Sequence, residues 1–309
     1  VAEAERGGHS ASAAAARPSS AGARRQAGGP AAEAADGLAE APALMAQLEA
    51  GGQAQLAAMA SLRGCVWRLA LEPLGCRAVQ LALQVADQTN RDFLLAELQG
   101  HVREAVVSPH ANYVVQQVVE VMPTPLVAFV AEELTGAAGR AARHRYGCRI
   151  LCRLLEHTIA TEATATLVDE LLAETAELSR HRFGHHVVES ALEHGLPEQR
   201  KRIALALVGD LQRHARNRNA SYVVEAALGH CGPDEREALA TGLLNGPGGL
   251  AALAQSQFGY HVVRAVLRHP GGGSDAALRQ LQRATEELRG SRYGQKLLES
   301  LRMNPTGRG

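Results

Sequence analysis

Large aromatic side chains are scarce in this chain of 309 residues, where four Phe, five Tyr and one Trp make up 3% of the sequence. A hydrophobic core must therefore be built mainly from Ala, Leu and Val, which suits closely packed helices and argues against a large β-sandwich. Hydrophobic residues make up 46% of the chain and charged residues 21%, which is enough to build a core and excludes disorder throughout.

Lysine is nearly absent, since Lys201 and Lys296 are the only two, and almost all of the positive charge is arginine. Basic and acidic residues balance at 32 each, so the net charge gives no argument for a nucleic-acid or membrane partner. The positions of the arginines have to decide instead, because guanidinium groups stack and form forked hydrogen bonds where ammonium groups do not.

Cysteines are few, and no apolar run reaches the length of about 18 residues that a membrane span needs. The first 40 residues also lack the apolar segment of a secretory signal. The cysteines are odd in number and include no C-x-x-C pair, which argues against a disulfide framework and favours a reducing compartment; they are Cys65, Cys76, Cys148, Cys152 and Cys231. We expect a soluble intracellular protein that contacts no membrane.

The composition changes sharply near residue 40 and divides the chain into segments. Residues 1–40 are rich in Ala, Gly, Ser, Pro and Arg and have little to bury, so we expect a disordered low-complexity tail. Residues 41–60 space their apolar residues as amphipathic helices do, which predicts a helical cap. A repeat array follows over 61–302, and a second disordered tail is expected over 303–309.

The array is recognised by seven segments that align without gaps. In order they read LGCRAVQLAL, HANYVVQQVV, YGCRILCRLL, FGHHVVESAL, NASYVVEAAL, FGYHVVRAVL and YGQKLLESLR. The small residue in second position recurs at steps of 36, 36, 37, 36, 39 and 35 residues, at Gly75, Ala111, Gly147, Gly184, Ala220, Gly259 and Gly294. Such regular self-similarity indicates a repeat architecture.

Each segment has the apolar spacing of one buried helix stripe, and two further helical stretches separate successive segments. A unit of about 36 residues cannot bury its apolar face alone and has to stack on its neighbours. The sequence therefore predicts an all-α fold, a curved right-handed α-solenoid of three-helix repeats of about 36 residues.

The side chains outside the buried stripe form a second pattern. We number each motif helix from the residue after the small one, so that places 3, 4, 7 and 8 are buried and places 1, 2 and 5 face away and converge. Place 2 holds six planar side chains and then a lysine, namely Arg77, Tyr113, Arg149, His186, Tyr222, His261 and Lys296. Planar groups one repeat apart predict slots for flat bases, whereas an ordinary solvated helix face would scatter Lys, Glu, Ser and Gln there.

Places 1 and 5 vary while the scaffold repeats, as a surface that reads successive bases requires. The pairs are Cys76 with Gln80, Asn112 with Gln116, Cys148 with Cys152, His185 with Glu189, Ser221 with Glu225, Tyr260 with Arg264, and Gln295 with Glu299.

These motifs resemble those of the Pumilio-homology (PUF) family, the RNA-binding α-solenoid of eukaryotes. GCRAVQ, ANYVVQ, YGCRIL and ASYVVE match its motif helix, and GCVWRLALEPLGCR resembles the helix that precedes it; the resemblance covers 61–302. Two departures stand out: seven repeats are found where the family usually has eight, and the last two motif helices carry unfamiliar pairs at places 1 and 5.

The resemblance implies that places 1 and 5 hydrogen-bond a base edge, that place 2 stacks, and that single-stranded RNA runs antiparallel to the protein. It then implies adenine for Cys76 and Gln80, uracil for Asn112 and Gln116, and guanine for Ser221 and Glu225. Cys148 is adenine-like although Cys152 replaces the expected Gln, and His185 with Glu189 is compatible with guanine. The target we expect contains 5′-G-N-A-U-A-3′, with two unassigned bases upstream.

The family further implies binding of mRNA 3′ untranslated regions for post-transcriptional repression or decay, by a cytoplasmic monomer that recruits mRNA-decay or translation-repression factors. Two alternatives stay open. One is a low-specificity binder of ribosomal or structured RNA in the nucleolus. The other is a protein-binding solenoid of the armadillo or HEAT type, although such a solenoid does not need a planar residue at place 2.

Other chemistry is disfavoured by the repeat register. His144, Cys148, Cys152 and His157 have helix-like spacing for zinc, but both cysteines fall at places 1 and 5. The segment from His186 to Ser190 approaches an H-x-x-E-H metalloprotease motif, yet Ser190 replaces the second histidine. No phosphate-binding loop or nucleophile elbow interrupts the repeats. We expect no enzyme, no cofactor and no metal.

Arginine pairs precede four of the motifs and recur with the repeat: Arg143 and Arg145, Arg180 and Arg182, Arg216 and Arg218, and Arg289 and Arg292. Phosphate contacts and salt bridges to neighbouring repeats explain them equally well.

Overall fold

The computed structural model describes residues 41–268 and 272–303, and within these ranges every regular element is helical. The tails expected at 1–40 and beyond Met303, and the start of the HPGGGSD insertion at 269–271, lie outside the described residues. None of the described helices is both long and apolar enough to cross a bilayer.

Each of the first six repeats contributes a short helix, a motif helix and an outer helix, and the described part of the seventh contributes a short helix and a motif helix. The short helices are α3 (Val66–Ala70), α6 (Val102–Ala105), α9 (Ala138–Ala142), α12 (Thr175–Arg180), α15 (Leu211–Arg216), α18 (Gly249–Ala254) and α21 (Thr285–Arg289). The motif helices are α4 (Gly75–Val85), α7 (Ala111–Val121), α10 (Gly147–Thr158), α13 (Gly184–His194), α16 (Ala220–His230), α19 (Gly259–Arg268) and α22 (Arg292–Met303). The outer helices are α5 (Gln88–Leu98), α8 (Thr124–Leu134), α11 (Glu162–Ala173), α14 (Pro197–Val208), α17 (Pro233–Asn245) and α20 (Gly272–Arg283).

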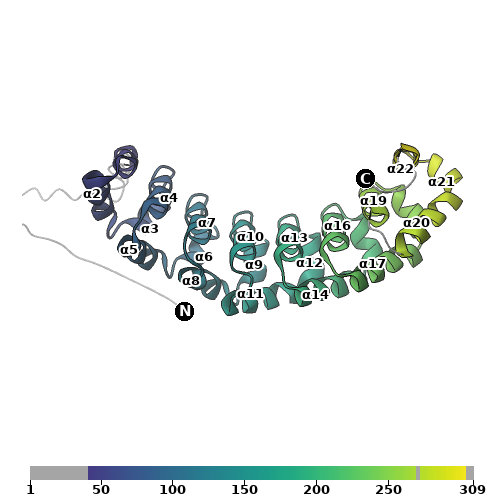
Figure 1. Cartoon of the computed structure of the whole chain (residues 1–309), viewed down its shortest axis with the longest axis horizontal. Helices are drawn as coiled ribbons and strands as arrows, with labels where there is room; N and C mark the ends of the chain where they lie inside the picture. The colour runs from purple at the N-terminus through teal and green to yellow at the C-terminus, as the bar shows by residue number, and fades with distance from the viewer. Residues whose placement is uncertain (1–40, 269–271, 304–309) are drawn as a thin grey trace, which may run out of the picture.

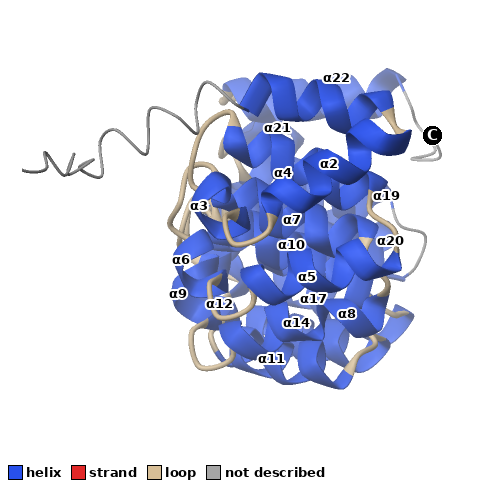
Figure 2. Ribbon diagram, turned by 90° about the vertical axis from the view of Figure 1, so that its left-hand side faces the viewer, coloured by secondary structure: helices blue, strands red, loops and turns tan. Residues whose placement is uncertain are grey.

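The repeats stack into a crescent (Figure 1), in which the motif helices line the concave side, the outer helices line the convex side and the short helices lie between them. Figure 2 shows the same array from one end as layers of helices without strands. The prediction of an all-α curved solenoid of three-helix repeats is confirmed. At the N-terminal end, residues 41–50 and α2 (Gly52–Leu62) form two helices that bury Leu48, Met59 and Leu62, whereas Leu56 is exposed.

The stacking depends on the apolar stripe of the motif helix. In α7, Val114, Val115, Val118 and Val119 at places 3, 4, 7 and 8 are at most 3% exposed, and α7 contacts both α4 and α10. The small residue before place 1 allows a close approach, because a Cβ at Gly147 would lie 2.5 Å from the carbonyl oxygen of Ala141. The repeats therefore share one continuous core along the crescent.

Local signals start the outer helices where the sequence places them. The Asp87 carboxylate accepts a hydrogen bond from the Asn90 amide at 2.9 Å and caps α5, and the Thr161 hydroxyl caps α11 in the same way. Pro197 and Pro233 occupy the first residue of α14 and α17, where their fixed φ suits a helix and no amide donor is needed.

In each of the first three repeats, a carboxylate on the outer helix links that helix to the short helix. It accepts two backbone N–H groups at the start of the short helix of the same repeat, and we call this arrangement the glutamate clasp. Its members are Glu97 on Gly64 and Val66, Glu133 on Gly100 and Val102, and Glu170 on Gly136 and Ala138. The first donor is a glycine with φ between 77° and 85°, a conformation that other residues rarely adopt. Our sequence analysis missed the clasp, although its glutamates recur at steps of 36 and 37 residues.

We expect Glu133→Ala to lower the free energy of unfolding by about 1–3 kcal/mol, because it leaves the Gly100 and Val102 amides without their acceptor. Urea denaturation followed by circular dichroism measures this loss. The matched control is Glu132→Ala on the same helix, whose exposed side chain makes no such bond and whose loss should stay within about 0.5 kcal/mol. Equal losses in the two variants would contradict the clasp.

Candidate nucleic-acid interface

The place-2 side chains form an exposed column on the helices that line the concave side of the crescent. All seven are exposed, with Tyr113 at 43% and Tyr222 at 55% of their full accessible surface. A planar group in nearly every repeat offers a ladder on which flat rings can stack. The place-2 side chains are therefore accessible, and their role in stacking stays a prediction.

Place 1 differs from the expectation that it faces away from the core. Cys76, Asn112, Cys148, His185 and Ser221 are all at most 7% exposed. Helical side chains lean towards the N-terminus, so a side chain in the first turn lies over the turn that precedes the helix. Each of the first four donates to a carbonyl there: Cys76 to Pro73, Asn112 to Ser108, Cys148 to Arg145, and His185 to His181. The base-edge pair thus consists of a buried place 1 and a half-buried place 5.

In repeats one and two the pairs are ordered by bonds within the helix. The Gln80 side-chain amide donates to the Cys76 carbonyl at 3.0 Å. The Gln116 amide donates to both the backbone carbonyl and the side-chain oxygen of Asn112, at 3.1 and 2.9 Å. These links hold the amide groups in place before any ligand arrives, which lowers the ordering cost of binding.

Repeat three has a hollow where the sequence departs from the family pattern. Cys152 is shorter than glutamine, and its thiol donates to the His186 carbonyl of the next repeat at 3.6 Å. A cavity of about 430 Å³ opens beside it, and the lining includes Gln116, Arg149 and Phe183. Burial, with the Cys148 thiol and two nearby carboxylates, raises the pKa of Cys152 to about 12. A protonated thiol bonded to a carbonyl offers little to a base edge.

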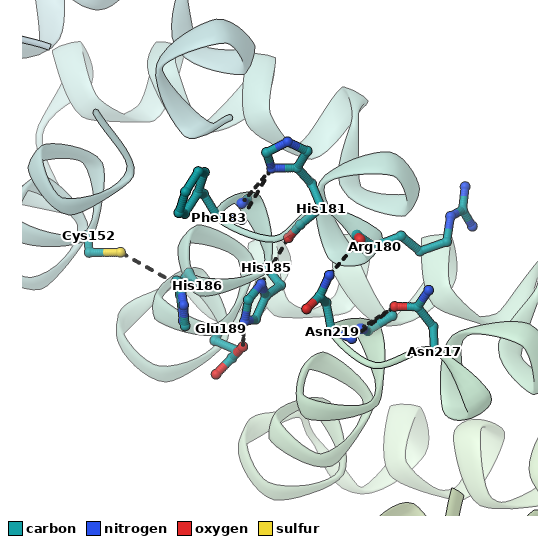
Figure 3. Close-up of polar contacts among 11 residues, drawn as sticks. Cys152, Arg180, His181, Phe183, His185, His186, Glu189, Asn217 and Asn219 are labelled. Carbon is teal, nitrogen blue, oxygen red and sulfur yellow. Dashed lines mark hydrogen bonds and ion pairs between the residues drawn. The ribbon is translucent and has the colours of Figure 1, made fainter. Parts of the chain in front are cut away.

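Repeat four brings two histidines and a carboxylate together on α13 (Figure 3). The Nε2 atom of His185 lies 3.8 Å from Oε1 of Glu189. Burial, and then the Glu225 carboxylate, raise the pKa of Glu189 to about 7, and burial lowers the pKa of both His185 and His186. The histidines are therefore neutral at neutral pH.

Repeat five presents Glu225 as a half-buried carboxylate beside the buried Ser221 hydroxyl. Burial raises the pKa of Glu225, and Arg268 and Arg264 oppose that rise. Tyr222 stacks towards the His185 ring of the preceding repeat, with ring centroids 6.3 Å apart and an interplanar angle of 25°.

In repeats six and seven, side chains of the motif helices contact one another and nearby aromatic rings. The Arg264 guanidinium lies over the Tyr260 ring, 5.6 Å from its centroid, and Tyr260 packs against Tyr293. Gln295 and Glu299 are exposed, and the Lys296 ammonium lies 5.8 Å from the centre of the Tyr293 ring. This geometry differs from the buried place 1 of the first five repeats.

Salt bridges to the neighbouring repeat account for Arg143 and Arg180, whereas Arg216 and Arg289 bond within their own short helix. The first arginine of each pair is held by the scaffold: Arg143 by Glu174 at 2.6 Å, Arg180 by Asp210 at 3.8 Å, Arg216 by Gln212, and Arg289 by Glu286. The second arginine of each pair, at 145, 182, 218 and 292, is exposed. Arg145 and Arg182 lie over Tyr146 and Phe183, 4.8 and 4.5 Å from the ring centroids. Phosphate contact is therefore open to the second members.

The zinc ligands considered from the sequence do not gather. Across the described ranges, the one group of three or more histidine, cysteine or acidic side chains close enough to share an ion is His185, His186 and Glu189. His144, Cys148, Cys152 and His157 form no such group there.

Five stretches of the chain match the Pumilio-family RNA binding repeat: residues 65–99, 106–135, 142–172, 175–208 and 215–244. The chain belongs to the Pumilio family. The matched stretches are the first five PUF repeats, those in which place 1 is buried. An Arabidopsis thaliana protein named pumilio homolog 7 is 28% identical over 101 residues, which is 32% of this chain and 16% of that relative. The alignment thus spans less than a fifth of the relative's length.

Solved structures agree with this assignment of the fold. The Puf3 RNA binding domain bound to a Cox17 RNA 3′ UTR recognition sequence superposes with a TM-score of 0.76 at 20% identity, covering 87% of this chain and 84% of that one. PUF-8 in complex with PBE-RNA superposes with a TM-score of 0.74 at 20% identity, covering 80% of this chain and 73% of that one. Puf4 bound to an HO endonuclease RNA 3′ UTR recognition sequence superposes with a TM-score of 0.71 at 22% identity, covering 77% of this chain and 75% of that one.

We expect Cys152→Gln to fill the hollow of repeat three and to give that repeat a preference for adenine. A bidentate contact to a base edge discriminates by about 1–3 kcal/mol, so oligonucleotides that differ only at that base should separate by that amount. Fluorescence anisotropy with an adenine and a cytosine version measures the difference. Cys152→Ala is the control, since it removes the thiol without adding an amide, and it should show no new preference. An unchanged ratio of affinities in the Gln variant would refute this interpretation of the hollow.

Proposed function

We propose that this protein binds single-stranded RNA in a sequence-specific manner on its concave side, at about one base per repeat. The observation that carries the proposal is the exposed column of place-2 side chains, next to pairs that are ordered in advance in the first two repeats. A stacked base gains about 1–3 kcal/mol, and the pair beside it reads the base edge.

The proposed bases follow the pairs. Cys76 with Gln80 reads adenine and Asn112 with Gln116 reads uracil. A carboxylate such as Glu225, next to Ser221, can accept from both N1 and N2 of guanine. With the RNA antiparallel to the protein, the target contains 5′-G-N-A-U-A-3′. The adenine opposite repeat three is selected weakly in the wild-type protein, because the Cys152 thiol is bonded to the His186 carbonyl.

We further propose that the bound RNAs are mRNA 3′ untranslated regions and that binding lowers their expression in the cytoplasm. The first point is supported by the Puf3 and Puf4 structures, which hold 3′ UTR recognition sequences. The same proposal includes repression or decay of the bound mRNA, recruitment of mRNA-decay or translation-repression factors, and a monomeric protein.

Selection of bound RNAs from a random pool tests the proposal as a whole. We expect recovered sequences to share a UA step at their 3′ end with guanine three bases upstream of that step. Recovery of unrelated RNAs would favour the low-specificity alternative, which the unfamiliar pairs of repeats six and seven keep open. Absence of RNA binding would overturn the proposal and favour a protein ligand.

We expect the double variant Ser221→Asn with Glu225→Gln to change the preference of repeat five from guanine to uracil. The change replaces the proposed guanine-accepting carboxylate with the amide pair of repeat two. Titration with two oligonucleotides, G and U at that base, should reverse the order of affinities by about 1–3 kcal/mol. The wild-type protein with the same two oligonucleotides is the reference. A preserved order would contradict the proposed assignment of Ser221 and Glu225.

A further inference from the structure

The cluster of His185, His186 and Glu189 on α13 has features that base reading does not require. The three residues stand at places 1, 2 and 5 of repeat four, and one ligand atom from each lies within 4.8 Å of the others. Figure 3 shows the His185 ring between the His181 carbonyl and the Glu189 carboxylate.

The hydrogen bonds fix the direction of the free lone pair on His185. Its side chain is 8% exposed, and Nδ1 lies 2.9 Å from the carbonyl oxygen of His181, so Nδ1 carries the hydrogen. Nε2 is then a bare acceptor, and it faces Oε1 of Glu189 at 3.8 Å. That oxygen is buried and has no hydrogen-bond partner among the described residues. When Glu189 is ionised, two acceptors face each other across this gap with no donor between them, and a proton or a metal ion can bridge them.

A cation between the two acceptors satisfies both. Imidazole nitrogen together with carboxylate oxygen suits zinc and similar divalent transition metals, whereas magnesium and calcium prefer oxygen ligands alone. Zinc holds such ligands at about 2.0–2.2 Å, so the three ligand atoms have to close to about 3.4 Å from one another. His186 is exposed and Glu189 half-buried, so both side chains can rotate inwards.

The surroundings complete the arrangement of a metal site. The His181 carbonyl orients the His185 ring through the second nitrogen, which is the usual support for a histidine ligand. The Glu225 carboxylate of the next repeat adds negative charge close to Glu189. Cys152 points its thiol at the His186 carbonyl and is not needed as a ligand.

We propose that Nε2 of His185, the imidazole of His186 and the carboxylate of Glu189 bind a divalent transition metal ion, with zinc as the natural candidate. The open coordination positions face the concave side. The metal takes the atoms that would otherwise contact a base, so an occupied site changes what repeat four can bind; this last clause rests on the proposed function.

The test is metal binding by the full chain in the absence of RNA, with cobalt as a spectroscopic probe and zinc as its competitor. We expect a cobalt spectrum without the charge-transfer absorption of a thiolate ligand, and displacement of cobalt by zinc. Glu189→Gln and His186→Ala should each weaken zinc binding by about tenfold or more, since even the loss of a residue that only supports a ligand costs about 10–100-fold. Both side chains are partly exposed, so these variants should fold, and circular dichroism checks that they do.

The same helix provides the matched controls. His194 and Glu193 also form a histidine–carboxylate pair at 3.8 Å, but Glu193 is exposed and no third ligand lies near them among the described residues. Glu193→Gln and His194→Ala should leave zinc binding unchanged. Equal loss in both sets of variants, no loss in Glu189→Gln, or a thiolate band from cobalt would overturn the proposal. Because these titrations contain no RNA, their failure is distinguishable from a failure of RNA binding.

Discussion

The structure depends on the lateral packing of one motif helix against the next through the apolar stripe at places 3, 4, 7 and 8. Small β-branched and aliphatic side chains fill this seam, and in α7 the four stripe residues are almost completely buried. A single repeat has nothing else against which to bury the stripe, so each repeat is stable only between neighbours. The curvature of the crescent, and with it the concave row of motif helices, follows from this repeated contact.

Because only places 3, 4, 7 and 8 form this seam, the residues at places 1, 2 and 5 can vary from repeat to repeat. In the first five repeats, place 2 points away from the seam and stays exposed, while place 1 is buried and place 5 lies half-buried. Each of these five repeats therefore presents one accessible planar group beside a buried place 1. A linear polymer with one flat unit per step is the kind of ligand that such a surface can follow.

Charged side chains are arranged differently from one repeat to the next, so the net charge of the whole sequence gave no information about a ligand. The first arginine of each pair is held by an acidic or amide side chain of the scaffold, and the second is exposed beside the concave helices. At repeat four the opposite holds: a buried carboxylate oxygen faces a bare histidine nitrogen without a cation. Repeats with the same helical scaffold therefore differ in local charge: the exposed arginines can bind an anion, whereas the acceptors of repeat four can bind a cation.

The sequence by itself determined the helical class, the repeat, the buried stripe and the column at place 2, because these features are periodic and depend on residue type alone. Only the tertiary structure decided that Asn112 and Ser221 are buried, that Glu133 clasps two amides some thirty residues away, and that Cys152 leaves a hollow. The approach of His185 to Glu189 also required it, since spacing along a helix gives the shared face but not the tautomer, the burial or the missing donor. These properties arise from contacts with the preceding turn and with neighbouring repeats, and a pattern read along one helix contains no information about them.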